Sequence, residues 1–105
     1  MERIGFAMRL KPGAEAEYRR RHAAVWPEML DALRAAGAVN YSIFLRGDDL
    51  FGYLEVDDFE RFRSQMHASP VNARWQAEMG DSLIDPLTDP ATGFHRRLDE
   101  VFHLD

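Results

Sequence analysis

The order of strand-like and helix-like segments along the chain leaves few folds open. Residues 3–10 alternate between apolar and other side chains, as expected of a strand with one buried face. The apolar positions of this segment share one side: Ile4, Phe6, Met8 and Leu10. Similar patterns predict, in chain order, a helical span over residues 14–36, strands over 38–46 and 50–56, helices over about 59–67 and 71–83, and a strand over 98–104. This β-α-β-β-α-β order predicts an α+β fold of the ferredoxin-like arrangement, in which helices cover one face of an antiparallel sheet.

A proline interrupts the first helical span. Residues 14–36 are rich in Ala, Glu, Arg and Leu, which favour helix, and Gly37 stands where a helix commonly ends. Pro27 has no backbone N–H to donate to the carbonyl of Ala23, and its ring crowds that turn. We therefore expect a kink or break in the helix near residues 23–26.

Turn-forming residues separate the later segments. Gly47-Asp48-Asp49 predicts a hairpin-like turn between the two central strands. Two prolines and a glycine predict that residues 85–93 form a loop. In the strand over 38–46, alternation predicts one set of apolar side chains on a common face: Val39, Tyr41, Ile43 and Leu45.

Two helical regions can cover only one face of a four-stranded sheet. The other face carries either Phe44, Phe51 and Tyr53 or Ile4 and Phe6, depending on the register of the strands. A large exposed apolar surface is a liability for a monomer. We therefore expect a homodimer in which the two sheets face each other, which is the dimeric α/β barrel architecture.

Length and composition bound the class of protein. A chain of 105 residues corresponds in size to one domain, residues 1–105. The formal charge of −5 disfavours nucleic acid and anionic membranes as partners. No cysteine is present, which removes disulfides, thiolate metal sites and cysteine nucleophiles. Because the start has no signal-peptide pattern and no stretch is long and apolar enough for a membrane span, we expect a cytoplasmic protein.

Three aromatic side chains recur at steps of four in the first helical span. Tyr18, His22 and Trp26 would share one helical face. The imidazole of His22 can exchange a proton near neutral pH, which makes it the first candidate for acid/base chemistry. The alternative is a surface histidine at the end of a charged run, in which Glu17 pairs with Arg21 on a solvated face.

Two other aromatic residues could contact a small ligand. Tyr41, like Tyr18, could hydrogen-bond a hydroxylated ligand, or it could be a packed tyrosine with one satisfied hydrogen bond. Trp75 could stack on the apolar face of a sugar ring, or it could be an ordinary core residue.

The acidic residues and the remaining histidines do not form a metal motif. Asp81, Asp85 and Asp89 recur every four residues but lack the spacing and the glycine of a calcium loop. His95 and His103 fall in different elements without a clear third ligand. There is also no phosphate loop or dinucleotide fingerprint, so we assign neither a metal nor a cofactor.

Several segments together resemble the L-rhamnose mutarotase family. The resemblance covers most of the chain and is carried by Glu17-Tyr18-x-x-Arg21-His22-x-x-Val25-Trp26-Pro27-Glu28, Gly37-x-x-Asn40-Tyr41-Ser42-Ile43-x-Leu45, Arg74-Trp75 and Leu98-x-x-Val101-Phe102-His103-Leu104. It implies a small homodimeric isomerase of rhamnose metabolism that interconverts the α and β anomers of L-rhamnose. It also implies that His22 is the proton donor and that Tyr18, Tyr41 and Trp75 bind the monosaccharide.

Two departures from the family pattern bear on which sugar is accepted. Family members commonly carry a second tryptophan directly after the first, where this chain has Gln76. The segment 88–93 also differs from the usual Asn-Pro-Asp-Asn-Ser-Pro run. A related 6-deoxysugar such as L-fucose is therefore an alternative substrate.

Mutarotation needs a proton removed from the C1 hydroxyl and a proton delivered to the ring oxygen. We expect His22 to protonate the ring oxygen, while a carboxylate, a tyrosine or water could serve as the base. Two other classes stay open on the same fold. One is a cofactor-free oxygenase, and the other is a ligand-binding module without catalysis.

Overall fold

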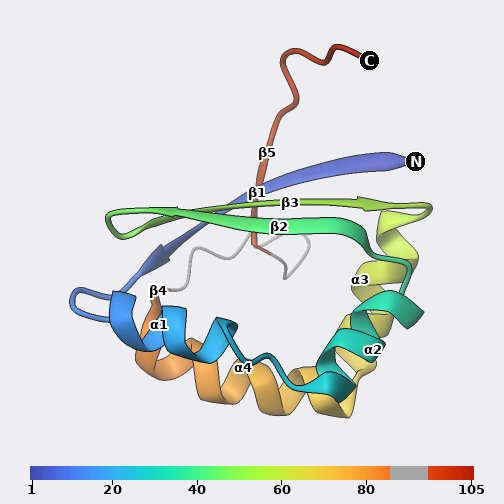
Figure 1. Ribbon diagram of the computed structural model, residues 1–105. Coiled ribbons are helices and arrows are strands. Elements are labelled where there is room, and N and C mark those ends of the chain that lie inside the picture. The colour runs from blue at the N-terminus through green and yellow to red at the C-terminus, as the bar shows by residue number, and fades with distance from the viewer. Residues whose placement is uncertain (86–94) are drawn as a thin grey trace.

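Four helices lie on one face of an antiparallel sheet in the computed structural model, which describes residues 1–85 and 95–105 (Figure 1). The elements of the described residues are β1 (Glu2–Leu10), α1 (Glu15–His22), α2 (Pro27–Ala35), β2 (Val39–Arg46), β3 (Asp49–Val56), α3 (Phe59–Ala68), α4 (Pro70–Leu83), β4 (Ile84–Asp85) and β5 (Arg96–Leu98). The predicted α+β class is confirmed: α1 and α2 occupy the interrupted helical span, and α3 and α4 correspond to the two helices predicted over about 59–67 and 71–83.

The sheet has the strand order β2-β3-β1-β4, and β5 also pairs with β1. All of these pairings are antiparallel. β1 therefore lies between the central hairpin and the late strands, which joins the two ends of the chain in one sheet. This is the order expected of the β-α-β-β-α-β connection.

Pro27 separates the first helical span into two helices, as predicted. It occupies the first turn of α2, where its missing N–H costs no hydrogen bond. Trp26, directly before it, has the extended angles φ −56° and ψ 134°, as expected of a residue that precedes proline. The chain therefore turns at residues 23–26, and α1 ends at His22.

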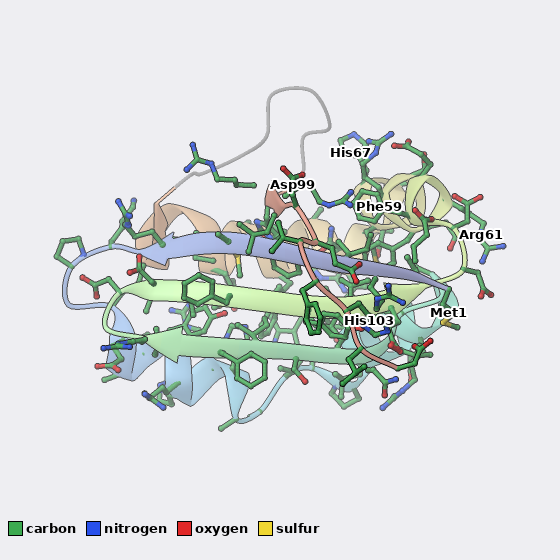
Figure 2. The ribbon with its side chains drawn as sticks, turned by 90° about the horizontal axis from the view of Figure 1, so that it is seen from above. Met1, Phe59, Arg61, His67, Asp99 and His103 are labelled. Carbon is green, nitrogen blue, oxygen red and sulfur yellow. The ribbon has the colours of Figure 1, made fainter. Side chains whose placement is uncertain are left out.

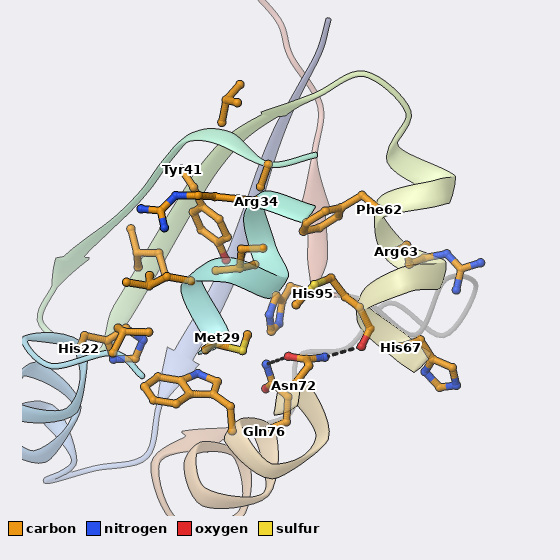
Figure 3. Close-up of a pocket in the computed structure, with 18 of the residues that line it drawn as sticks. His22, Met29, Arg34, Tyr41, Phe62, Arg63, His67, Asn72, Gln76 and His95 are labelled. Atoms are coloured by element: carbon orange, nitrogen blue, oxygen red, sulfur yellow. Dashed lines mark hydrogen bonds between the residues drawn. The ribbon is translucent and has the colours of Figure 1, made fainter. Parts of the chain in front are cut away.

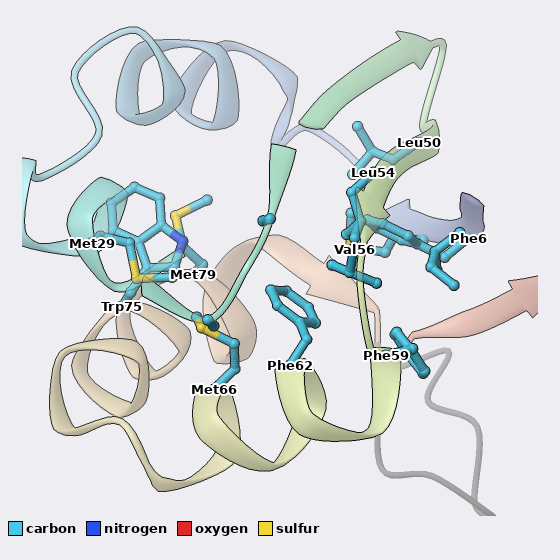
Figure 4. Packing of buried hydrophobic residues seen from close by; sticks show 14 of the residues in the cluster. Phe6, Met29, Leu50, Leu54, Val56, Phe59, Phe62, Met66, Trp75 and Met79 are labelled. Carbon is cyan, nitrogen blue, oxygen red and sulfur yellow. The ribbon is translucent and has the colours of Figure 1, made fainter. Parts of the chain in front are cut away.

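The core lies between the helices and the inner face of the sheet (Figure 4). The four predicted apolar residues of β1 are all buried, with at most 5% of their surface exposed. The ring of Phe6 lies directly over Gly52 of β3, where a Cβ atom would come within 2.1 Å of its Cζ atom. Only glycine leaves room for this ring, so Gly52 determines where Phe6 sits.

A β-bulge in β2 changes the predicted face of Val39. The register pairs Val39 with Glu55 but Ser42 with Tyr53, so β2 holds one extra residue at this point. Asn40 adopts φ 50°, a left-handed conformation that asparagine tolerates. The expectation that Val39 shares a face with Tyr41 is therefore wrong, because the bulge shifts the alternation by one residue.

The C-terminal segment also differs from its prediction. β5 ends at Leu98, and residues 99–105 form no strand, although a strand was expected over 98–104. Figure 1 shows this segment rising from the sheet on the side away from the helices. The chain leaves β1 here, so most of these residues have no strand of the same chain to pair with. Of the predicted loop, Asp85 belongs to β4 and the remainder lies outside the described residues.

The outer face of the sheet carries exposed aromatic side chains. Phe44 and Phe51 lie opposite each other in the register, and they are 62% and 45% exposed. Figure 2 looks onto this face and shows His103 of the C-terminal segment above the strands. The register thus selects Phe44, Phe51 and Tyr53 as the outer residues and buries Ile4 and Phe6. Among the helices of the described residues, none is both long and apolar enough to cross a membrane.

Candidate functional site

A cavity of about 960 Å³ opens between the helix layer and the inner face of the sheet (Figure 3). Its described lining residues are apolar and polar in nearly equal number, so the wall can both pack against a small molecule and hydrogen-bond it. The predicted site residues His22, Tyr41 and Trp75 are all part of this wall. The chain therefore brings three of its four predicted site residues to one cavity, from α1, β2 and α4.

His22 is half-buried at the C-terminal end of α1. Its ring is stacked on the ring of Tyr18, with centroids 4.0 Å apart and planes inclined by 24°. Its Nδ1 atom lies 3.0 Å from the backbone oxygen of Tyr18. Because a carbonyl oxygen can only accept a hydrogen bond, Nδ1 carries the proton. In the neutral imidazole, Nε2 is therefore the basic nitrogen.

Burial keeps the imidazole of His22 neutral at physiological pH. The loss of solvent lowers the pKa of His22, and the hydrogen bond to the Tyr18 carbonyl offsets only part of this effect. A neutral imidazole with one free lone pair can accept a proton and then release it, which suits acid/base catalysis.

The ring of Tyr18 packs against the imidazole of His22. Its side chain is only 5% exposed, and burial raises the pKa of its hydroxyl to about 12. The predicted pairing of Tyr18 with His22 on one helical face is confirmed by the stacked rings. Tyr18 thus stacks on the imidazole but is not among the described residues that line the cavity.

Trp75 packs against His22 and is itself in contact with Trp26. Trp75 meets the imidazole edge-on, with centroids 5.5 Å apart, and meets Trp26 edge-on at 5.1 Å. The expected common helical face of His22 and Trp26 is not formed, because α1 ends before Trp26. Trp75 connects the two residues instead. It is a core residue, 8% exposed, and also part of the cavity wall, while its stacking on a sugar ring stays a prediction.

Tyr41 contributes a neutral phenol from the sheet side of the cavity. Its ring meets Phe6 edge-on, with centroids 6.0 Å apart. Burial raises the pKa of its hydroxyl, and the proximity of Tyr18 adds to the increase. The hydroxyl therefore stays protonated at neutral pH and can both donate and accept hydrogen bonds.

Arg21 is not part of a solvated face, in contrast to the expectation for the charged run. It pairs with Glu17 at 2.8 Å as predicted, but its side chain is half-buried and also donates to the backbone oxygen of Glu78 at 2.5 Å. Glu78 belongs to α4, so Arg21 connects the helix of His22 to the helix of Trp75. This contact holds two walls of the cavity together.

Seven polar residues of the described cavity wall were not predicted as site residues, and three of them are Asn72, Gln76 and His95. Asn72 donates to the backbone oxygen of Met66 at 2.8 Å, and Gln76 donates to Asn72 at 3.2 Å. Their spacing around Trp75 on α4 could have indicated this shared face. The third residue, His95, follows a segment without periodicity, so no pattern pointed to it.

The described side chains contain no cluster of three potential metal ligands. His103 lies on the C-terminal segment, where it contacts Asp105 at 2.8 Å. The side chains of Asp81, Asp85 and Asp89 lie outside the part of the chain whose side chains the structure describes.

Fold and site together define a small α+β protein with a neutral histidine at an aromatic, hydroxyl-bearing cavity. The profile of the L-rhamnose mutarotase family matches residues 3–104. Two relatives are named L-rhamnose mutarotase. The one from Listeria monocytogenes is 57% identical over 99% of both chains, and the one from Burkholderia orbicola is 44% identical over the full length of both. The crystal structure of L-rhamnose mutarotase from Formosa agariphila matches with a TM-score of 0.81 at 27% identity, again over both whole chains.

The match over nearly the whole length shows that this chain belongs to the L-rhamnose mutarotase family.

Proposed function

We propose that the protein is an isomerase that interconverts the α and β anomers of L-rhamnose. The observation that carries the proposal is the neutral imidazole of His22 at a cavity that also holds a tyrosine hydroxyl and a tryptophan. Family membership supplies the substrate, because the related proteins carry the name L-rhamnose mutarotase.

The tautomer of His22 suggests how one residue can serve both proton transfers. Nε2 removes the proton of the C1 hydroxyl and then donates it to the ring oxygen, while the bond between C1 and the ring oxygen breaks. Both oxygens are bonded to C1, so one imidazole can face them in turn. The product is the open-chain aldehyde, which recloses on its other face with the reverse transfers. No net proton is gained or lost, and a positioned acid/base group of this kind contributes about 10²–10⁴-fold.

The neighbouring aromatic residues have distinct roles in this proposal. Tyr41 holds a sugar hydroxyl, and Trp75 packs against the apolar face of the sugar. Tyr18 fixes the ring and the tautomer of His22 through stacking and through its backbone carbonyl. A direct contact of the Tyr18 hydroxyl with the sugar, which the family resemblance implies, stays a prediction.

We further propose that residues 1–105 form one domain that assembles as a homodimer through the outer face of the sheet. Support comes from the exposed Phe44 and Phe51 and from the apolar C-terminal segment, in which Val101 and Phe102 are 94% and 79% exposed. A second copy would cover both features at once, as in a dimeric α/β barrel. A chain without cysteine has no disulfide to form, which agrees with an activity in the cytoplasm.

The proposal is tested by measuring anomer exchange of L-rhamnose with saturation-transfer NMR or polarimetry. We expect His22→Ala to lower the rate by about 10²-fold or more, since the group that carries the proton is removed. Arg19→Ala is the matched control, because Arg19 lies on the same helix, is exposed and, among the described residues, forms an ion pair with Glu15 at the surface. Wild-type exchange rates in His22→Ala would disprove the role of His22.

The other candidate functions predict different results in the same preparation. A ligand-binding module would bind the sugar without accelerating exchange. A cofactor-free oxygenase would consume oxygen with quinol-like substrates. A preference for L-fucose would show as faster exchange of that sugar than of L-rhamnose.

A further inference from the structure

We propose that His95 binds a hydroxyl of the sugar and thereby determines which aldose the protein accepts. This inference rests on the proposed function, because it assumes that the cavity holds a monosaccharide. It concerns a residue outside the group of His22, Tyr18, Tyr41 and Trp75.

His95 belongs to the same cavity as His22 but comes from a different part of the fold. It directly precedes β5, and its neighbour Arg96 pairs with Ala7 of β1. The sheet therefore fixes the backbone next to His95, whereas the helix layer carries His22. Figure 3 shows the two imidazoles at separate positions around the cavity. A sugar between them would be contacted on two sides.

The ring of His95 is held in place by the core. It stacks on Phe6, with centroids 5.1 Å apart and planes inclined by 20°. The same Phe6 ring supports Tyr41 and is itself seated on Gly52. His95 and Tyr41 are therefore positioned by one rigid anchor, as expected of two groups that recognise one ligand.

The protonation state of His95 suits hydrogen bonding better than proton transfer. Burial lowers its pKa to about 4, so the ring is neutral at physiological pH. A neutral imidazole offers one donor and one acceptor, which matches a sugar hydroxyl. A group with so low a pKa is a weak base at pH 7, so the proton transfers are left to His22.

A fixed polar group of this kind discriminates between stereoisomers. L-rhamnose and L-fucose differ only in the configuration of ring hydroxyls. A site that hydrogen-bonds a hydroxyl in one configuration leaves its own polar group unsatisfied when that hydroxyl points elsewhere. His95 can therefore select among sugars that His22 would process alike.

The test compares His95→Phe with His95→Gln. Phenylalanine keeps the stacking on Phe6 but has no hydrogen-bonding group, whereas glutamine keeps one donor and one acceptor. For each variant, kcat and KM of exchange and the Kd from calorimetric titration are measured with L-rhamnose and L-fucose. We expect His95→Phe to raise KM and Kd for the preferred sugar about tenfold, to leave kcat within about threefold, and to reduce discrimination about tenfold. Glutamine should restore most of each value.

Unchanged KM, Kd and discrimination in His95→Phe would overturn the proposal, and so would a large loss of kcat at constant Kd, since His95 would then act in the chemical step. The imidazole NMR signals of His95 in the wild-type protein give a test that needs no variant. They should shift on addition of L-rhamnose, and an absence of any shift at saturation would also overturn the proposal. If the wild-type protein binds the sugar but does not accelerate exchange, the proposed function fails while the binding data still decide the role of His95.

Discussion

At the scale of single residues, the surroundings of a side chain change its proton affinity. His22 and His95 are both imidazoles of one cavity, and burial lowers the pKa of each. His22 gains a partner in the Tyr18 carbonyl, which selects its tautomer and offsets part of the burial effect. For His95, burial lowers the pKa to about 4. The two residues have the same side chain, but the surroundings that determine the pKa of each imidazole differ.

The low pKa of His95 predicts an acid-sensitive contribution to stability. An unfolded histidine has a pKa near 6.5, so between pH 6.5 and 4 the unfolded state binds a proton that the folded state excludes. Stability therefore falls as the pH is lowered through this range. We expect the free energy of unfolding of the wild-type protein to fall by about 3 kcal/mol more than that of His95→Phe between pH 7 and pH 4. Urea titrations at both values measure this, and parallel losses would contradict the expectation.

At the scale of elements, contacts between strands and helices hold the site together. Arg21 attaches α1 to the backbone of α4, and Phe6 of β1 occupies the space above Gly52 of β3. These contacts link the helix side and the sheet side of the cavity to the core. Arg21, Phe6 and Gly52, which are not among the described lining residues, therefore help to position the residues that line the cavity.

Gly52→Ala should disturb the site from a distance. The added methyl group would lie 2.1 Å from the Phe6 ring, so the ring must move and its neighbours Tyr41 and His95 lose their support. We expect a loss of about 1–3 kcal/mol in stability, the usual effect of overpacking, together with slower anomer exchange.

Gly5→Ala on β1 is the matched control. Within the described part of the chain, its added methyl group would meet the Cβ of Leu98 at 3.8 Å, which is an ordinary contact. Thermal melts and exchange rates of both variants decide the comparison. Equal effects of the two substitutions would show that Phe6 is not an anchor.

At the scale of the whole molecule, one face of the sheet and one end of the chain stay uncovered. The helices cover the inner face, and the C-terminal segment extends beyond the outer face (Figures 1 and 2). Phe44 and Phe51 are exposed on that outer face. Apolar surface of this kind is stabilised when a partner removes it from water. In a dimer with a twofold axis, the C-terminal segment of each copy would cover the outer face of the other copy's sheet in the same way.

The proposed dimer predicts that a charge in the C-terminal segment favours the monomer. Phe102→Asp would place an unpaired carboxylate at the interface, which we expect to weaken association by about 2 kcal/mol or more, or about 30-fold in Kd. Sedimentation velocity over a range of concentrations measures this. Gln65→Asp, on the exposed surface of α3, is the control and should leave the mass of the sedimenting species unchanged. A wild-type protein that sediments as a monomer at all concentrations would exclude the dimer.

The sequence predicted best those features that depend on local periodicity. The alternation in β1 and the break at Pro27 follow from side-chain spacing and from the missing N–H of proline, and both are confirmed. The bulge at Asn40 was missed, because one extra residue in a strand leaves no periodic signal. The end of β5 was also missed, since apolar content alone does not reveal whether a neighbouring strand is available.

By itself, the sequence determined the order of the elements, the apolar face of β1 and the pairing of Tyr18 with His22, because each depends on residues close together in the chain. Only the tertiary structure decided that Trp75 supports His22, that Arg21 joins two helices and that His95 enters the cavity. These contacts connect residues more than fifty positions apart or from different elements. The packing of helices on the sheet creates them, and no local pattern encodes that packing.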